Sequence, residues 1–245
     1  MTRETPSLSK RAVSEAVGTA FLLAAVVGSG IMGERLAGGN VAVALLANTM
    51  ATGAVLVALI YGLAPISGAH FNPAVSAASA IGGELAWRDL PGFVGAQIVG
   101  AFTGVAVAHL MFELPVFSVS QHARTGIAQL LSEAVATFGL LLVIGRCARA
   151  RAPVAIAVGA YITAAYWFTA STSFANPAVT LARAFSNTFA GIRPVDAPGF
   201  VLAQLIGAAG ATLLLRWFAA APAAHERNGE DRSHAKTPRT VSMHR

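Results

Sequence analysis

Two copies of the tetrapeptide Asn-Pro-Ala-Val, each set within apolar sequence, constrain the fold more than any other feature of this chain. They occupy residues 72–75 and 176–179. Asparagine is favoured at the N-cap of a helix and proline at its first position, so each copy predicts a helix start. The helices would run over about 73–81 and 177–185, and at ~1.5 Å per residue each spans about 15 Å. Because that is half of the ~30 Å hydrocarbon core, the pattern indicates a membrane channel with two half-length helices meeting near the midplane.

The composition is typical of a membrane protein. Hydrophobic residues make up 55% of the 245 residues and charged residues 11%, whereas a soluble domain has about 25% charged residues. The mean hydropathy is +0.63. A spanning helix needs about 20 apolar residues, and six runs come near or exceed that length: 12–31, 41–63, 90–111, 127–147, 153–170 and 198–219. The sequence therefore predicts an all-α membrane protein with six transmembrane helices and two re-entrant half-helices, the span at 153–170 being the shortest.

The landmarks of the first half of the chain recur in the same order in the second half. Ser14-Glu15-Ala16-Val17 returns at 132–135, and Asp89-Leu90-Pro91-Gly92-Phe93 returns in similar form at 196–200. Each half has three spans and one half-helix, and the halves cover about 11–111 and 127–219. Since three is odd, the second half enters the membrane from the opposite side. This predicts an inverted 3+3 repeat, aquaporin-like in arrangement, with its functional site where the repeats meet.

The positive charges indicate the topology. Of the 17 Lys and Arg residues, four fall in segments on one side of the predicted membrane: Arg35, Arg124, Arg183 and Arg193. Nearly all the others fall on the opposite side, which places both termini in the cytoplasm. Residues 1–10 are expected to form a cytoplasmic segment, 11–220 the channel domain and 221–245 a disordered cytoplasmic tail. The net charge of +6 then reflects topology and not a nucleic-acid partner, and the single cysteine excludes an intramolecular disulfide or a Cys-rich metal site.

The segments that precede the two boxes are expected to line a pore. A residue before proline is pushed to an extended conformation, and non-helical backbone at membrane depth is tolerated only where it is buried or lines a cavity. The expected pore-lining residues are Gly68, Ala69, His70, Phe71, Ser171 and Thr172. Asn72 and Asn176 are expected to cap their own helices through the side-chain oxygen and to point N–H groups at the lumen, where the positive helix ends disfavour cations.

Glu15 and Glu133 are intramembrane carboxylates at equivalent positions of the repeat, and such groups are functional candidates by default. As a proton relay they would imply a pump or exchanger; as hydrogen-bond acceptors they would support the loop backbones. No matching intramembrane Lys or Arg provides a relay, which favours the supporting role. His70 has two interpretations, a ligand or proton shuttle and a loop residue that contributes its carbonyl, and the second is preferred.

The two boxes, the segment 67–71 and the repeated glutamates together resemble the major intrinsic protein family, the aquaporins and aquaglyceroporins, over about residues 10–220. The boxes comprise Asn72, Pro73 and Ala74, and Asn176, Pro177 and Ala178. The resemblance implies a homotetramer with one pore per subunit and passive conduction of small uncharged solutes through the lipid bilayer. It also implies a second constriction, the aromatic/arginine filter. By spacing from the boxes, its four positions fall on Thr52, Ala164, Ser173 and Val179.

All four filter positions depart from the family's pattern of aromatic residues and arginine. Small side chains there predict a wide, weakly polar neck. The chain is similar in this respect to bacterial aquaglyceroporins associated with arsenic detoxification, which implies arsenite, the uncharged As(OH)3, and methylated arsenicals as solutes at a bacterial inner membrane. Arg183 lies one helical turn beyond Val179, and either extends to the outer mouth or reaches back toward the filter.

The sequence is also compatible with two other functions. One is a general facilitator of glycerol, urea and water, and the other is an ion-coupled secondary transporter built from inverted repeats. The sequence has no combination of nucleophile, base and orienting group and no cluster of metal ligands, so neither an enzyme nor a cofactor is expected.

Overall fold

The structure, a computed structural model, describes residues 6–220, and every regular element in that part of the chain is a helix. The helices are α1 (Leu8–Leu36), α2 (Val41–Ser67), α3 (Pro73–Gly82), α4 (Leu90–Met111), α5 (Ile127–Arg149), α6 (Val154–Phe168), α7 (Pro177–Arg183) and α8 (Ala197–Ala219). The predicted disordered tail, 221–245, lies outside the described residues.

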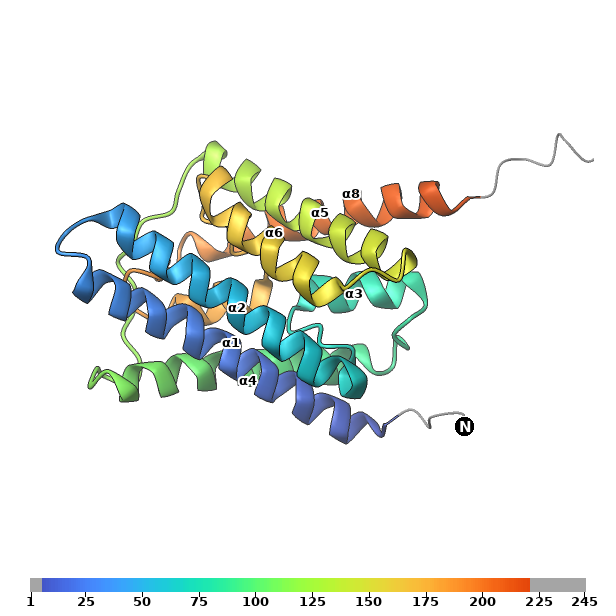
Figure 1. Cartoon of the computed structure of the whole chain (residues 1–245), viewed down its shortest axis with the longest axis horizontal. Helices are drawn as coiled ribbons and strands as arrows, with labels where there is room; N and C mark the ends of the chain where they lie inside the picture. Colours follow the sequence, from blue (N-terminus) through green and yellow to red (C-terminus); the bar gives the residue numbers. More distant parts are fainter. Residues whose placement is uncertain (1–5, 221–245) are drawn as a thin grey trace, which may run out of the picture.

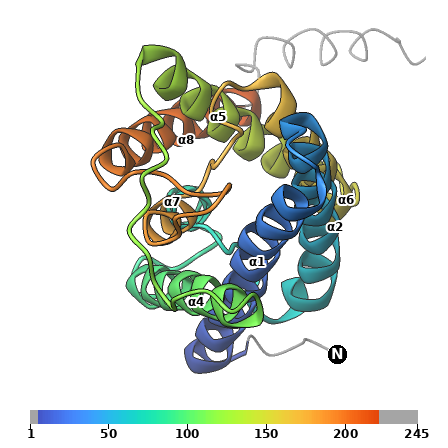
Figure 2. The same cartoon turned by 90° about the vertical axis from the view of Figure 1, so that its left-hand side faces the viewer.

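The long helices run side by side and enclose the two short ones (Figure 1). The start of α1 and the end of α8 lie at the same end of the bundle, here called the terminal end; the opposite end, which holds the α1–α2 turn and the segments 112–126 and 184–196, is called the distal end. Seen from the distal end, α7 lies inside a ring of longer helices with α3 behind it (Figure 2). The short helices therefore occupy the middle of the bundle, as a pair of re-entrant half-helices must.

Within residues 6–220, five helices are long and apolar enough to cross a membrane, namely α1, α2, α4, α5 and α8. The sixth predicted span, α6, is helical for 15 residues, about 23 Å at ~1.5 Å per residue. It is shorter than the predicted run 153–170 because the backbone leaves the helix at Thr169, whose conformation is extended. α6 still packs beside α2 and α5 in the ring, so the predicted arrangement of helices holds.

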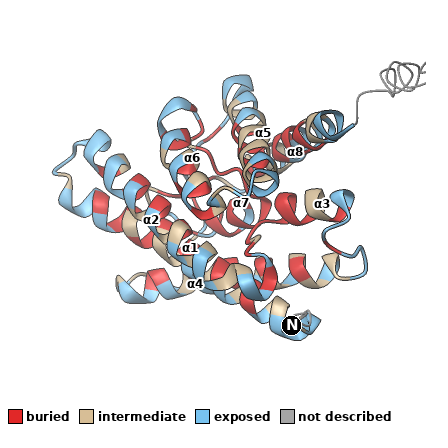
Figure 3. Cartoon of the chain, turned by 45° about the vertical axis from the view of Figure 1, so that its right-hand side comes forward, coloured by how far each residue is buried: buried red, intermediate tan, exposed pale blue. Residues whose placement is uncertain are grey.

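The two halves of the chain use the same packing device. A Cβ added to Gly100 on α4 would lie 2.2 Å from the carbonyl oxygen of Ala16, and one added to Gly207 on α8 would lie 2.2 Å from that of Ala134. Only glycine allows α1–α4 and α5–α8 to approach this closely. Buried residues face the interior of the bundle, while the outward faces are exposed (Figure 3), and large apolar side chains such as Phe21 are among the exposed ones. Such outward faces suit contact with lipid.

Candidate functional site: the pore between the half-helices

The two boxes meet tip to tip in the middle of the bundle. The Asn72 side-chain oxygen accepts a hydrogen bond from the Ala74 N–H at 2.9 Å, and that of Asn176 accepts from the Ala178 N–H at 3.0 Å. Each asparagine therefore caps the half-helix that it begins, and proline occupies the first turn of both α3 and α7. The helix starts predicted from the boxes are the ones observed.

The asparagine amides also join the two halves of the chain. Asn72 Nδ2 donates to the Ala175 carbonyl and Asn176 Nδ2 donates to the Phe71 carbonyl, both at 2.7 Å. An amide nitrogen has two N–H groups, so one crosses to the other repeat and the second remains for the lumen. The expectation from sequence, that the asparagine amides point N–H groups at the lumen, did not include this cross-repeat pair. Both asparagines line the central cavity.

The two buried glutamates support the loops. Glu15 accepts hydrogen bonds from the backbone N–H groups of His70 at 3.0 Å and Phe71 at 2.7 Å. Glu133 accepts from Phe174 and Ala175, both at 2.9 Å. Neither glutamate lines the cavity, so the geometry is that of the supporting role and not of a relay along the pore.

A glutamine completes each of these networks. Gln97 Nε2 donates to Glu15 and to Ser76 Oγ, both at 2.8 Å. Gln204 Nε2 donates to Glu133 at 2.6 Å and to Thr180 Oγ1 at 2.8 Å. Since each glutamine holds both a glutamate and a half-helix, α4 and α8 fix the half-helices relative to the loops. The glutamines follow the repeated Asp-x-Pro-Gly-Phe segments, and that spacing was the only sequence signal for them.

The loops need this support because their backbone is unusual. Ala69 and Phe71 in the first loop have φ values of 53° and 49°, and the equivalent Ser173 and Ala175 have values of 50° and 47°. Non-glycine residues in this left-handed region cost of the order of 1 kcal/mol or more each. In this conformation the carbonyl groups of the loop do not form helical hydrogen bonds. The carbonyls of Ala69 and His70 accept no hydrogen bond from described residues.

A cavity of about 510 Å³ runs from the terminal end to the distal side of the boxes. Arg11, Glu84, Arg149 and Arg216 line its terminal end. The predicted loop residues Gly68, Ala69, His70 and Phe71 line its middle. Nδ1 of the His70 ring lies 3.0 Å from Oγ of Ser76, a buried residue of α3, so the ring is also tied to the first half-helix.

The predictions for the second loop need a correction. Ser171 and Thr172 do not line this cavity; the loop residues that do are Ser173, Phe174 and Ala175. Ser171 and Thr172 lie under the distal segments instead, where Arg124 Nη1 donates to the Ser171 carbonyl at 3.1 Å. The inverted repeat explains the offset, because the second loop enters from the distal end and only its inner part reaches the boxes.

The distal neck is the part of the cavity formed by Thr52, Tyr166, Ser173, Val179 and Arg183. Thr52 on α2, Ser173 in the second loop and Val179 in the second box line it, as three of the four filter positions inferred from the family would. Tyr166 Oη donates to Thr52 Oγ1 at 3.3 Å. The sequence had indicated a neck without aromatic side chains or arginine. The structure instead places Tyr166 and Arg183 in it.

The fourth predicted filter position, Ala164, is wrong. Its side chain is exposed and lies outside the cavity lining. The α6 residues that line the cavity recur every four positions, at Val154, Val158, Ile162 and Tyr166. Ala164 lies two residues from Ile162 and two from Tyr166, which places it about 200° around the helix from each at ~100° per residue. α6 thus contributes Tyr166 at this level.

Arg183 does not extend to the distal surface, which was the first of the two interpretations of the sequence. Only 2% of the residue is exposed. The guanidinium carbon lies 3.4 Å from the centroid of the Phe174 ring, and Nε donates to the Ala190 carbonyl. The side chain folds back toward the pore because the segment 184–196 covers it.

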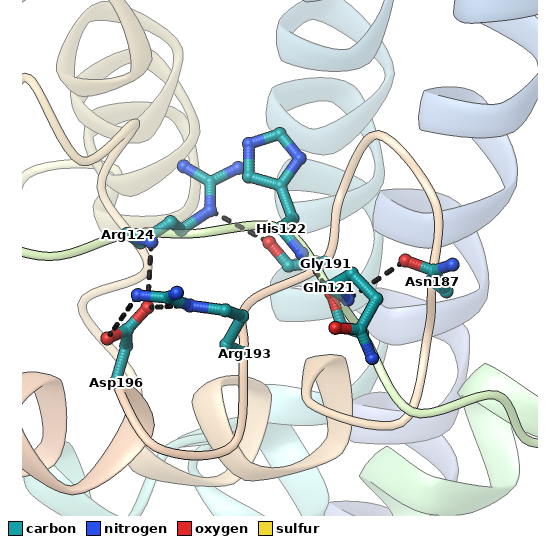
Figure 4. A network of polar contacts seen from close by, with 8 residues as sticks. Gln121, His122, Arg124, Asn187, Gly191, Arg193 and Asp196 are labelled. Atoms are coloured by element: carbon teal, nitrogen blue, oxygen red, sulfur yellow. Dashed lines mark hydrogen bonds and ion pairs between the residues drawn. The ribbon is translucent and has the colours of Figure 1, made fainter.

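The distal segments are tied together above the neck (Figure 4). Arg124 Nε donates to the Gly191 carbonyl at 2.8 Å, and its backbone N–H donates to Asp196 at 2.9 Å. Arg193 Nε pairs with the same Asp196 carboxylate at 3.0 Å. Burial alone would raise the pKa of Asp196, but the hydrogen bonds from Arg193 and from the Arg124 backbone outweigh it and hold that pKa below its usual value. Arg124 gave no sequence signal beyond its charge.

The fold, the paired half-helices and the continuous cavity define a multi-pass membrane channel for small solutes. The family model described as "Major intrinsic protein" matches residues 2–153 and 146–242, and the chain belongs to that family. Its members are channels and not enzymes.

Among curated relatives, the aquaglyceroporin AqpS of Rhizobium meliloti (strain 1021) is 59% identical over 211 residues, which cover 86% of this chain and 90% of the relative. Aquaporin NIP3-1 of Arabidopsis thaliana is 31% identical over 190 residues, 71% of this chain and 58% of the relative. The aquaglyceroporin from Plasmodium falciparum has the same fold, with a TM-score of 0.68, 19% identity and coverage of 86% of this chain and 96% of that one.

Proposed function

We propose that this channel conducts small uncharged solutes that carry several hydroxyl groups, above all arsenite as As(OH)3 together with methylated arsenicals. It would do so passively, as a homotetramer in a bacterial inner membrane with both termini in the cytoplasm. The filter would consist of Thr52, Tyr166, Ser173 and Val179, with the boxes Asn72–Ala74 and Asn176–Ala178 as the central constriction.

The observation that supports this proposal most is the position of Val179. It lines the distal neck three residues after the asparagine of the second box, where the family usually has arginine. A valine side chain is short and offers no donor, so a solute that passes it keeps more room and fewer fixed hydrogen bonds. Valine at this position therefore restricts the size of a solute less than arginine would, although Arg183 keeps a positive charge in the same neck.

The middle of the pore fits a solute with hydroxyl groups. The Asn72 and Asn176 amides each use one N–H in the cross-repeat pair, which leaves one donor each for a solute. The Ala69, His70, Ser173 and Phe174 carbonyls accept no hydrogen bond from described residues, so they are free to accept from solute hydroxyls. A compact molecule such as As(OH)3 can exchange water for these groups along the whole path.

The related bacterial protein AqpS is named an aquaglyceroporin, which favours glycerol as a second solute. A general facilitator of glycerol, urea and water thus shares the same site and differs in the ranking of solutes. The ion-coupled transporter is less favoured, because Glu15 and Glu133 are engaged with loop backbone and do not face the cavity.

The experiment is solute flux into proteoliposomes for Val179→Arg, with Val179→Ala as the matched control. Restoring the guanidinium is expected to lower arsenite and glycerol flux at least tenfold, which corresponds to about 1.4 kcal/mol added to the barrier, while Val179→Ala conducts both as well as the parent. Unchanged arsenite flux in Val179→Arg would contradict the proposed filter. Arsenite flux that follows an imposed proton or sodium gradient would instead establish the transporter.

A further inference from the structure

Arg183 is a buried cation with no anionic partner in the part of the chain that the structure describes. It is nearly inaccessible from outside the molecule and lines the distal neck. Its Nε donates to the Ala190 carbonyl and its guanidinium lies over Phe174, but none of the ion pairs among described residues includes it. Its two terminal nitrogens donate to no described residue. A charge taken out of water in this way is costly unless it is paired, and within a membrane protein it marks a functional site.

A second cation reinforces the positive field at this point. The Arg124 guanidinium carbon lies 4.9 Å from the centroid of the same Phe174 ring, and Arg124 also forms no ion pair through its side chain among described residues. His122, two residues before Arg124, feels both positive charges. Burial, and then the charges of Arg124 and Arg183, hold the pKa of His122 below its usual value.

The neck also contains an unused polar atom. Ser173 Oγ is buried and has no hydrogen-bond partner among described residues, although Ser173 lines the neck. Its backbone φ of 50° and the Glu133 bonds to the next two residues fix where it lies. Buried hydroxyl groups are normally paired, so this hydroxyl has a hydrogen bond to offer to a ligand that binds against Ser173. Together with the guanidinium it supplies several donors that lack an acceptor.

We propose that the distal neck contains a binding site for a compact, singly charged oxyanion, held by the terminal N–H groups of Arg183 and by the Ser173 hydroxyl. A guanidinium binds two oxygens of a carboxylate or tetrahedral oxyacid side by side, which matches the free edge of Arg183. The inference goes beyond the conduction of neutral solutes and does not depend on arsenite being one of them.

A bound anion would occupy the path of neutral solutes, so the site can be detected by inhibition. Glycerol flux into proteoliposomes is measured while hypophosphite, which stays ionised at neutral pH, is added on both sides. Potassium gluconate replaces it at equal ionic strength as a bulky anion. The variants are Arg183→Gln, Arg183→Lys and Ser173→Ala. Arg88→Gln is the matched control, since Arg88 is 89% exposed and outside the cavity lining. Each flux is expressed relative to the same variant without hypophosphite.

Hypophosphite is expected to inhibit the parent and Arg88→Gln equally, with gluconate inactive. Arg183→Gln should require at least about tenfold more hypophosphite, the loss expected for a charged hydrogen bond, with Arg183→Lys in between. Insensitivity of the parent, or equal inhibition of parent and Arg183→Gln, would overturn the proposal. If Arg183→Gln does not insert, equal inhibition of the parent, Arg183→Lys and Ser173→Ala would overturn it as well. Glycerol flux without hypophosphite tests the channel itself, so the two failures are distinct.

Discussion

Replacement of Glu133 by glutamine should destabilise the second pore loop and nearly close the pore. Glu133 accepts three hydrogen bonds, from the Phe174 and Ala175 N–H groups at 2.9 Å and from Gln204 Nε2 at 2.6 Å. Its Oε1 faces one of these donors and Oε2 faces two. A glutamine amide therefore fits best with its NH2 in the place of Oε1, which sets it against the Phe174 N–H. One buried N–H then loses its acceptor.

The cost can be worked out from these contacts. A hydrogen bond to a charged group contributes about 1.5–3 kcal/mol and a neutral one about 1 kcal/mol. Losing the Phe174 bond and weakening the other two gives about 3–5 kcal/mol. The loop conformation is already unfavourable without this loss, because Ser173 and Ala175 have φ values of 50° and 47°. We expect the loop to leave this conformation and displace the Asn176 amide from the Phe71 carbonyl.

The measurement pairs thermal unfolding of purified protein with glycerol flux in proteoliposomes. Glu133→Gln should unfold about 10 °C below the parent, at ~2–4 °C per kcal/mol for a chain of this size, and lose at least nine-tenths of its flux. Glu34→Gln is the control, since Glu34 is exposed on α1. Equal unfolding temperatures for the two variants would refute the reasoning that the carboxylate holds the loop.

Two further changes test the packing and the distal network. Gly207→Ala places a Cβ 2.2 Å from the Ala134 carbonyl oxygen and should destabilise the protein by about 1–3 kcal/mol, whereas Gly95→Ala, with open space around it, should be neutral or stabilising in a thermal melt. Asp196→Asn should remove a pH dependence: the depressed pKa of Asp196 means that its stabilising effect is present above the unfolded-state pKa of about 3.9 and is lost as the pH falls through the folded-state value. Melts between pH 3 and 6 should therefore be flatter for the variant, and an equal slope in parent and variant would count against the Arg193 pair.

The helix starts at the boxes could be predicted because the signal is local. Asn72 and Asn176 cap their helices through their own side chains, and no distant residue is needed to place them. The role of the paired glutamates could also be predicted. A repeated intramembrane carboxylate must find hydrogen-bond donors nearby, and the loops are the nearest source of free N–H groups.

The distal neck could not be predicted in the same way. Counting back from the second box to Ala164 crosses the non-helical segment between α6 and α7, so the helical phase of α6 is lost, and Tyr166 takes the position instead. The orientation of the Arg183 side chain depends on its contacts with the Ala190 carbonyl and the Phe174 ring. These contacts cannot be inferred from the spacing of residues on α7. The cross-repeat bonds of Asn72 and Asn176 likewise join residues about a hundred positions apart.

The exchange between the two boxes has a consequence for biogenesis. Asn72 donates to the Ala175 carbonyl, 103 residues further along the chain, so the first half emerges from the ribosome long before its partner exists. During that interval its amide and the Phe71 carbonyl must be hydrated or held by the insertion machinery. The midplane thus cannot be sealed before the second half has been synthesised, and a nascent chain stopped before Ala175 would remain an unfinished, open half.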